Sequence, residues 1–583
     1  MKKRIPLILI LVLSAVCSIA TVSTPLPTKE GQGSGSSSSS RRSSKPRRQS
    51  DSRIHLLHAD ELFFDKAKNP DAQILRGHVR FRHDGVILTC DSACYYEDNN
   101  SFDAFGHVRM NQADTLTLTS RVLFYDGADQ MARARYDVVL THRKSKLYCD
   151  SLDYDRLYDL GYFFQGGKLV DQDNTLTSEW GQYSPATREA VFNYNVDLHN
   201  PDFTLLSDTL HYNTGTAIAR IVGPSNIDNG DNHIYSERGS YDTNAGHAYL
   251  LDRSIVSNKG TTITGDSLDY LEEGSTCRAY HNIIYMDKDN QNMFTGNYVL
   301  YIDSIGYAEA ADSACCIDFS QRDTMYIHAD TFKLYTYDID TDSIWREMRA
   351  YNHVRAFRID MQAVCDSMVY ITRDSCLTMY RDPILWQQGQ QLLGEEIKAW
   401  MNDSTIDSTH VMRQALSVER MDSISFNQVT GNIMRSYFVD GKMRLTHVEG
   451  NVLVNYYPLD DDSLMIGLLH AESTQLKLFV GPKKLEKIWM PEAEGKLHPL
   501  ALIPPHERNL DNFQWFDYVR PVDKYDIFNW RPKQAGSELK ASVQHTKPQS
   551  TLQNRQGEAK AKDKPKKAGL KAAANASSNK GFP

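Results

Sequence analysis

Apolar and polar residues alternate over short stretches of this chain, and one alternating stretch recurs many times. Its pattern is a small residue, an acidic or amide residue, and then an apolar and an aromatic residue two and four positions later, as in Gly-Asp-Ser-Leu-Asp-Tyr at 265–270. Side chains of a strand alternate between its two faces, so the apolar and aromatic positions share one face. The pattern predicts strands with one buried and one exposed face.

The stretch repeats at intervals of 27 to 36 residues, most often 29. A second strand is expected 17 to 19 residues after each polar origin, following a turn such as Gly106-His107. One unit cannot bury its apolar face alone, so we expect an all-β fold of stacked units with a shared interior. If each unit adds one layer of about 4.8 Å, the body is a rod about 60 Å long. The copies have their origins at Asp60, Asp91, Ser120, Asp150, Glu179, Asp208, Glu237, Asp266, Asn297, Asp330, Asp366, Glu395 and Asp422.

The two ends differ from this body in composition. The first residues combine Lys2, Lys3 and Arg4 with an apolar run and a small-residue site, which is typical of a cleaved secretory signal. Low apolar content predicts disorder in a Ser- and Arg-rich linker and in a Lys- and Ala-rich tail. Lipidation at Cys17 is left open. The expected divisions are the signal peptide 1–20, the linker 21–53, repeats at 54–230 and 231–458, a cap or docking segment at 459–531, and the tail 532–583.

Charge is unevenly distributed along the chain. The formal net charge is −9, but the basic ends leave about −25 on residues 54–532. Nucleic-acid binding needs Lys and Arg arrayed along one face, so no nucleic-acid partner is expected. No stretch after the signal approaches the roughly 20 apolar residues of a membrane helix. The mature protein is therefore expected to be soluble or peripheral to a membrane.

The repeat resembles that of OstA-like domains, in which an Ala-Asp-x-apolar-x-Tyr stretch is followed by Gly-Asn-Val. Here residues 59–62 precede Gly77-His78-Val79, and residues 90–95 precede Gly106-His107-Val108. The resemblance is clearest over residues 55–230 and continues more loosely to about residue 455. It implies an elongated, repeat-built β-jellyroll, with two apposed antiparallel sheets around an apolar groove, of the long form expected in a Bacteroidetes-type envelope.

The resemblance also implies a function, because this family serves lipopolysaccharide transport. We expect a periplasmic protein, peripheral to the outer membrane, that binds the lipid A acyl chains of lipopolysaccharide and supports outer-membrane assembly. Its edge strands would pair with other Lpt-type envelope proteins and with further copies of the chain, head to tail. The inward positions of the repeat would line the groove. These lipid-groove candidates are Leu62, Phe64, Tyr95, Val122, Phe124, Leu152, Tyr154, Leu210, Tyr212, Leu268 and Tyr270.

Residues with catalytic or metal-binding chemistry recur with the repeat, whereas an active site is needed only once. The Asp-Ser pairs fit turn-to-strand junctions, where their side chains can accept backbone N–H bonds. His107, His211, His281 and His353 are expected in turns or outward positions. No nucleotide-binding or hydrolase motif is present, so we expect neither an enzyme nor a metal or other cofactor.

Eight cysteines remain after the signal peptide, which suits an oxidising compartment. Cys90, Cys149 and Cys365 occupy a position that holds Ala, Ser or Gly in other copies. That position selects for small size, so we expect packed free thiols there. The pair Cys315-Cys316 is left unassigned.

Two other functions are compatible with the sequence. The chain could be a non-enzymatic envelope scaffold that binds partner proteins by β-strand addition, above all if its sheets close fully and the aromatic ladder is only packing. It could also be a β-helical carbohydrate-active enzyme, for which Asp460-Asp461-Asp462 is the carboxylate run outside the repeat.

Overall fold

The structure is a computed structural model that describes residues 53–541 and 544, apart from 66–70, 113–114, 231, 259, 272, 290, 321–322, 340, 342, 388, 403–405, 440–441, 461 and 482–484. The expected signal peptide, nearly all of the linker and most of the tail lie outside the described residues. None of the helices in this part of the chain has the length and apolar character needed to span a membrane.

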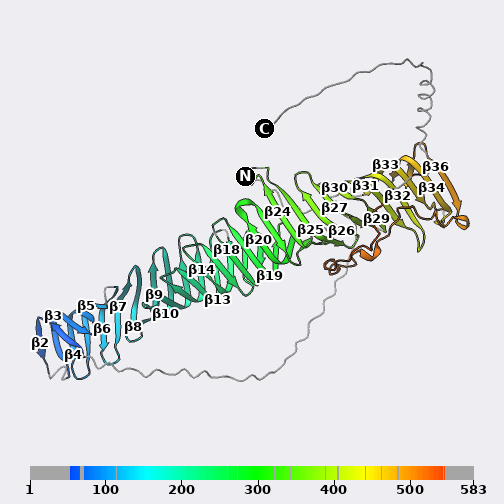
Figure 1. Ribbon diagram of the computed structural model, residues 1–583. Helices are drawn as coiled ribbons and strands as arrows, with labels where there is room; N and C mark the ends of the chain where they lie inside the picture. The colour runs from blue at the N-terminus through cyan, green and yellow to red at the C-terminus, as the bar shows by residue number, and fades with distance from the viewer. Residues whose placement is uncertain are drawn as a thin grey trace, which may run out of the picture.

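The described residues form one long antiparallel stack of strands (Figure 1). Twenty layers are single long strands: β3 (Gln73–His83), β4 (Val86–Tyr96), β5 (Ser101–Gln112), β6 (Leu116–Asp126), β7 (Met131–His142), β8 (Ser145–Asp155), β9 (Leu160–Asp171), β10 (Asn174–Ser184), β11 (Glu189–His199), β12 (Thr204–Asn213), β13 (Ile218–Asp228), β14 (Asn232–Asp242), β19 (Thr276–Asp287), β20 (Asn292–Ile302), β25 (Trp345–Arg358), β26 (Met361–Ile371), β31 (Ile406–Arg420), β32 (Phe426–Val439), β33 (Lys442–Tyr456) and β34 (Gly467–Val480).

Eight further layers consist of two short strands in line. They are β1 (His55–His58) with β2 (Glu61–Phe64), β15 (His247–Leu251) with β16 (Ile255–Asn258), β17 (Thr261–Thr264) with β18 (Ser267–Leu271), β21 (Tyr307–Ala311) with β22 (Cys315–Asp318), β23 (Met325–His328) with β24 (Thr331–Tyr337), β27 (Cys376–Tyr380) with β28 (Ile384–Gln387), β29 (Gln390–Leu393) with β30 (Glu396–Met401), and β35 (Leu485–Trp489) with β36 (Glu494–Pro499). Short 3₁₀ turns are η1 (Asp303–Ile305), η2 (Leu500–Leu502), η3 (Asp517–Val519) and η4 (Asp526–Phe528).

The rod is about twice as long as the sequence analysis predicts. The described strands make 28 layers, which at about 4.8 Å per layer correspond to roughly 130 Å. The prediction of one layer per repeat was wrong because each repeat supplies two successive strands and each of them spans the full width of the stack.

A corner divides these layers into two halves. In β3, Leu75 pairs with Ala93 before the corner and Val79 pairs with Cys90 after it. Between them Gly77 and His78 have φ values of 76° and 44°. Twelve corners in the described residues carry two consecutive residues of positive φ, at the turn positions expected from the repeat. Two successive left-handed residues redirect a strand, so its halves join different sheets.

We call the half that contains Leu75 and Ala93 sheet 1, and the half that contains Val79 and Cys90 sheet 2. Their inner faces pack directly together. Phe81 of sheet 2 stacks on Phe102 of sheet 1 with ring centroids 4.3 Å apart and planes within 8°. The all-β class and the pair of apposed antiparallel sheets predicted from the sequence are therefore confirmed.

Tyrosines in sheet 1 alternate with small residues on the neighbouring strands. Tyr154 pairs with Ala132 on one side and Gly161 on the other. The next tyrosine positions of the repeat follow the same rule. Strands are about 4.8 Å apart, so a ring leaning along the stack needs a small neighbour to fill the interior without voids. The alternation accounts for one tyrosine per two-strand repeat between Tyr154 and Tyr241, whereas Tyr125 pairs with Phe102 on one side.

The segment expected to form a cap, residues 459–531, divides into two parts. Strands β34 to β36 extend the stack beyond the predicted end at residue 458. The chain then runs back along the outer face of sheet 2, below β29 and β26 in Figure 1. We call this returning segment, residues 503–541, the strap.

Buried side chains on the outer face of sheet 2 hold the strap by its backbone. Gln391 donates through Nε2 to the carbonyl of Gln514 at 2.9 Å, and its Oε1 accepts the N–H of Phe516 at 2.8 Å. Gln428 holds the chain near Leu510 in the same two-sided way. Arg355, which is fully buried, donates to the carbonyl of Val519 at 3.0 Å. These outward polar positions are therefore attachment points rather than solvated residues.

Candidate functional site

Most of the predicted lipid-groove residues lie in the interior between the two sheets. Leu152, Tyr154, Leu210 and Leu268 have no exposed surface, and Tyr212 is 1% exposed. Tyr95 is also buried, while Tyr270 is partly exposed. The interior is therefore closed around these side chains. An acyl chain can reach them only if the sheets separate locally.

Two of the candidates are placed on the wrong face by the sequence analysis. In β6 the buried residues are Leu123 and Tyr125, whereas Val122 is partly exposed and Phe124 is 39% exposed. The repeat origin in this copy is Arg121 rather than Ser120. A shift of one residue moves every side chain of a strand to the opposite face.

Two other candidates face inward but remain about half exposed. Leu62 pairs with the buried Leu75, so both lie on the inner face, yet Leu62 is 55% exposed and Phe64 is 50% exposed. Both lie on β2, in the first layer of the described stack. This layer presents an unpaired strand edge together with exposed apolar side chains, which favours pairing with another strand.

Hydrogen bonds join the two sheets along the edge opposite the corners, and we call this line of contacts the seam. Tyr212 of sheet 1 donates its hydroxyl to Asp171 Oδ2 at 2.9 Å and accepts Asn174 Nδ2 at 3.0 Å. Asp171 and Asn174 flank the β9–β10 turn of sheet 2. The tyrosine ring thus fills the interior while its hydroxyl fastens the opposite sheet.

The seam continues toward the amino-terminal end of the rod. His83 of sheet 2 shares a 2.6 Å hydrogen bond with Tyr125 of sheet 1, and His142 shares one of 2.7 Å with Tyr183. Burial raises the pKa of Tyr125 to about 12, so its hydroxyl remains protonated at neutral pH. Burial also lowers the pKa of His142, which favours the neutral imidazole. Burial likewise raises the pKa of Tyr183, so the His142–Tyr183 contact joins two neutral groups at neutral pH.

The seal is weakest near the middle of the rod, in a region that we call the waist. Here the core divides into two clusters, one ending at Ile283 and the other beginning at Ala310, with the partly exposed Val299 packed against both. The inward residues Tyr270, Tyr285 and Phe294 are partly exposed, and Tyr301 is 42% exposed. In the waist, apolar interior surface therefore reaches solvent in the closed rod.

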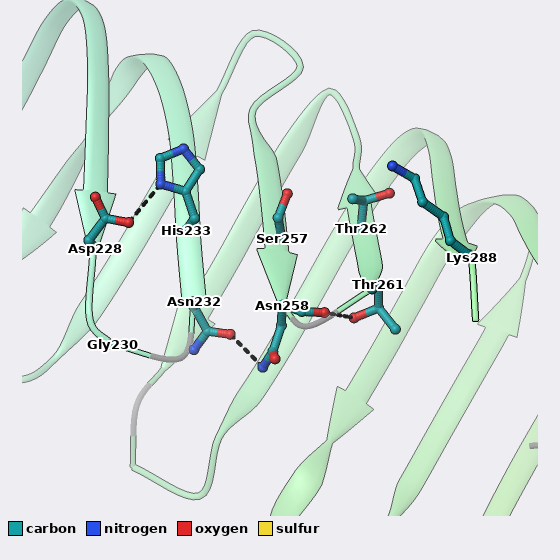
Figure 2. Close-up of a pocket in the computed structure, with 10 residues that line it drawn as sticks. Asp228, Gly230, Asn232, His233, Ser257, Asn258, Thr261, Thr262 and Lys288 are labelled. Atoms are coloured by element: carbon teal, nitrogen blue, oxygen red, sulfur yellow. Dashed lines mark hydrogen bonds and ion pairs between the residues drawn. The ribbon is translucent and has the colours of Figure 1, made fainter. Parts of the chain in front are cut away.

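A shallow polar pocket lies beside the waist, on the free edge of sheet 2 (Figure 2). Its volume is about 340 Å³, and Asn258, Thr261, Thr262 and Lys288 contribute to its lining. At one end of it Asp228 pairs with His233 at 2.7 Å, as Figure 2 shows. The pocket offers hydroxyls, amides and a cation rather than an apolar surface.

The recurrent acidic residues stabilise the corners. His78 Nδ1 lies 2.8 Å from Asp60 Oδ2, and His107 Nδ1 lies 2.7 Å from Asp91 Oδ2. Each carboxylate thus bonds the side chain of a left-handed corner residue on the adjacent strand. At these two corners the partner is a side chain rather than the backbone N–H predicted from the sequence. Asp422 does accept the backbone N–H groups of Ile424 and Ser425, as predicted. Hydrogen bonding to His78 and His58 lowers the pKa of Asp60, which keeps this carboxylate charged.

The remaining candidate chemistry has structural explanations in the described part of the chain. Its eight cysteines are unpaired, including the buried Cys315 and Cys316. Within the same residues no group of three or more His, Cys, Asp or Glu side chains could hold a metal ion. Asp460 caps a turn, because its Oδ1 accepts the N–H of Asp462 at 3.0 Å and of Leu464 at 2.8 Å.

The comparison with protein families agrees with the repeat pattern. A model of the family described as "OstA-like protein" matches residues 51–208. Among solved structures, the chain is similar to the crystal structure of LptH, "the LptA homologous periplasmic component of the conserved lipopolysaccharide transport device from Pseudomonas aeruginosa", with 17% identity and a TM-score of 0.17 over 18% of this chain and 79% of that chain. No curated protein matches the sequence. Residues 51–208 of this chain are an OstA-like domain.

Proposed function

We propose that this protein binds lipopolysaccharide in the periplasm and carries its acyl chains between the two sheets, as part of an outer-membrane transport assembly. The observation that carries this proposal is the apolar interior, which extends from Ile54 to Ile283 through and beyond the OstA-like domain. No catalytic step is involved, and no cofactor is required. Lipid would enter by local separation of the sheets.

The energies involved are compatible with such opening. A seam hydrogen bond contributes about 1 kcal/mol net, whereas transfer of an acyl chain from water contributes about 0.8 kcal/mol per methylene. The lipid also replaces the apolar contacts that the sheets lose when they separate. A chain of about ten methylenes can therefore offset the opening of several seam contacts.

A second function, strand-mediated scaffolding, is favoured by the closed interior and the uncovered first layer. Leu57, Leu62 and Phe64 are all at least 42% exposed on β1 and β2. An edge of this kind pairs with a strand of another protein or of a second copy of the chain. Head-to-tail association with Lpt-type partners would use this edge in either function.

Photo-crosslinking in living cells distinguishes the two functions. A photoreactive residue at Leu210 or Tyr212 faces the interior, and one at His211 on the same strand faces outward. Lipopolysaccharide captured at the inward positions alone is the expected result. Absence of lipid at both inward positions, with protein captured at Leu57, would reject lipid carriage and favour the scaffold.

A further inference from the structure

The waist brings apolar, aromatic and polar groups together within a few strands. Asn292 begins β20 and lies on the same face as the inward Phe294, because side chains two positions apart share a face. It is 1% exposed, yet neither its Oδ1 nor its Nδ2 has a hydrogen-bond partner. Burying an amide without hydrogen-bond partners costs about 1 to 3 kcal/mol of folding free energy. A ligand that hydrogen-bonds to Asn292 would offset this cost.

The same position is satisfied elsewhere in the repeat. Asn174 begins β10 and is also buried, but its Nδ2 donates to Tyr212 and Thr243 at 3.0 and 2.9 Å, and its Oδ1 accepts Asn200 at 2.8 Å. Asn174 thus contributes to the seam through all its polar atoms. Asn292 occupies the corresponding place at the waist without making those contacts.

Oxygen-bearing residues extend from Asn292 across neighbouring strands. Asn292 pairs with Asp287 on one side and with Asp318 on the other, and Asp287 pairs in turn with Thr261. Asp287 and Asp318 are 5% and 3% exposed. Two carboxylates disfavour an anionic group here, whereas amide and carboxylate oxygens accept hydrogen bonds from hydroxyls. The chemistry of this row therefore fits a neutral, hydroxyl-rich group such as a sugar.

Apolar and polar surfaces adjoin on either side of this row. Inward of it lie the partly exposed rings of Tyr285 and Phe294, whose centroids are 6.5 Å apart. Outward of it, Thr261 also lines the polar pocket of Figure 2, which includes Lys288, the residue after Asp287. A molecule with an acyl chain and a sugar would find both kinds of surface within one short stretch of the rod.

We propose that the waist is a glycolipid entry site, where Asn292, Asp287 and Asp318 bind sugar hydroxyls while the acyl chain contacts Tyr285 and Phe294. This inference rests on the proposed function and gives it a place and a head-group chemistry. Lipid enters at the waist and then passes between the sheets toward the sealed part of the interior.

The first test compares Asn292→Leu with Asn174→Leu in the full-length protein, using fluorescent rough lipopolysaccharide and, as a sugar-free lipid, phosphatidylethanolamine. Asn292→Leu removes the proposed hydrogen bonds between the amide and the sugar, so it should weaken lipopolysaccharide binding about 5- to 10-fold without weakening phosphatidylethanolamine binding. It should not lower the denaturation midpoint, because no protein bond is lost. Asn174→Leu should lower that midpoint, which shows that the assay detects a structural asparagine. Unchanged lipopolysaccharide binding by Asn292→Leu would overturn the entry site.

The second test follows the order of loading with photoreactive residues at Tyr285, at the sealed Leu210 and at the outward Tyr298. The expected result is early capture of lipopolysaccharide at Tyr285, later capture at Leu210 and none at Tyr298. Capture at Leu210 without prior capture at Tyr285 would overturn the entry site and leave the proposed function intact. Absence of capture at both inward positions would overturn both.

Discussion

Replacement of Tyr212 by Phe tests whether the seam holds the two sheets together. The substitution keeps the buried ring and removes the hydroxyl that donates to Asp171 at 2.9 Å and accepts from Asn174 at 3.0 Å. Asp171 is 2% exposed, and its other carboxylate oxygen accepts Ser145 Oγ at 2.7 Å. A hydrogen bond to a charged group contributes about 1.5 to 3 kcal/mol and a neutral one about 1 kcal/mol. We expect local destabilisation of about 2 to 4 kcal/mol.

Tyr183→Phe is the matched control. Its hydroxyl contacts His142 at 2.7 Å and Thr214 at 3.4 Å, both without a carboxylate. Its loss should cost about 1 kcal/mol. The comparison separates loss of a charged partner from the general effect of removing a buried hydroxyl.

Hydrogen exchange measured by mass spectrometry suits this prediction, because stacked repeats open locally rather than in one global transition. Protection should fall most in peptides from β9 to β12 and remain unchanged in β31 to β33. The reasoning would be refuted if Tyr212→Phe lost no more protection than Tyr183→Phe. It would also be refuted if both regions lost protection equally.

Three further predictions concern the seam, the corners and the strap. Burial holds the pKa of His142 below its ordinary value near 6.5. The neutral His142 therefore contributes fully to stability above that pH, and its contribution declines as the pH falls below it. Between pH 7.5 and 5 the urea midpoint should fall more for the natural protein than for His142→Gln. Tyr194 has a φ of 65° and is 59% exposed, so Tyr194→Gly should relieve left-handed strain and raise the unfolding free energy by about 0.5 to 1 kcal/mol; a lower free energy in chemical denaturation would contradict this. Gln391→Ala removes two hydrogen bonds to the strap backbone, so it should speed proteolysis within residues 503–541. Gln390→Ala, at an exposed position on the same strand, should not. Equal cleavage rates for the two variants would show that the Gln391 amide does not hold the strap.

The repeat and its inner face could be predicted from the sequence because they follow from strand periodicity. Tyr154 and Tyr212 recur with the spacing of the polar origins and are buried as expected. The copy at Ser120 was misplaced because Val122 and Leu123 are both apolar, so hydrophobicity alone did not fix the register. The sequence correctly predicted that Leu62 lies on the inner face of the first layer. Its exposure arises because no further layer of the described stack covers that face, and a local sequence pattern contains no information on this.

The strap and the seam could not be predicted because they depend on contacts between distant segments. Gln391 and Gln428 occupy outward positions that resemble a solvated strand face, and only the strap, more than 80 residues later, shows that they are buried. Asn174 and Asn292 have similar places in the sequence, because each begins a long strand. Their roles differ because the facing edge of sheet 1 offers Tyr212 as a hydrogen-bond partner to Asn174 and, among the described residues, none to Asn292, which the sequence alone does not show.

The pairing of tyrosines with small neighbours in the repeats from Tyr154 to Tyr241 also governs how the length of this part of the rod can change. Removal or addition of one whole repeat of about 29 residues leaves each ring beside a small residue and each corner beside its acidic partner. Removal of a single strand would instead place two tyrosines on adjacent layers and reverse the direction of every later strand. The rod can therefore lengthen or shorten in steps of about 9.6 Å, so its length is set by an integer number of repeats.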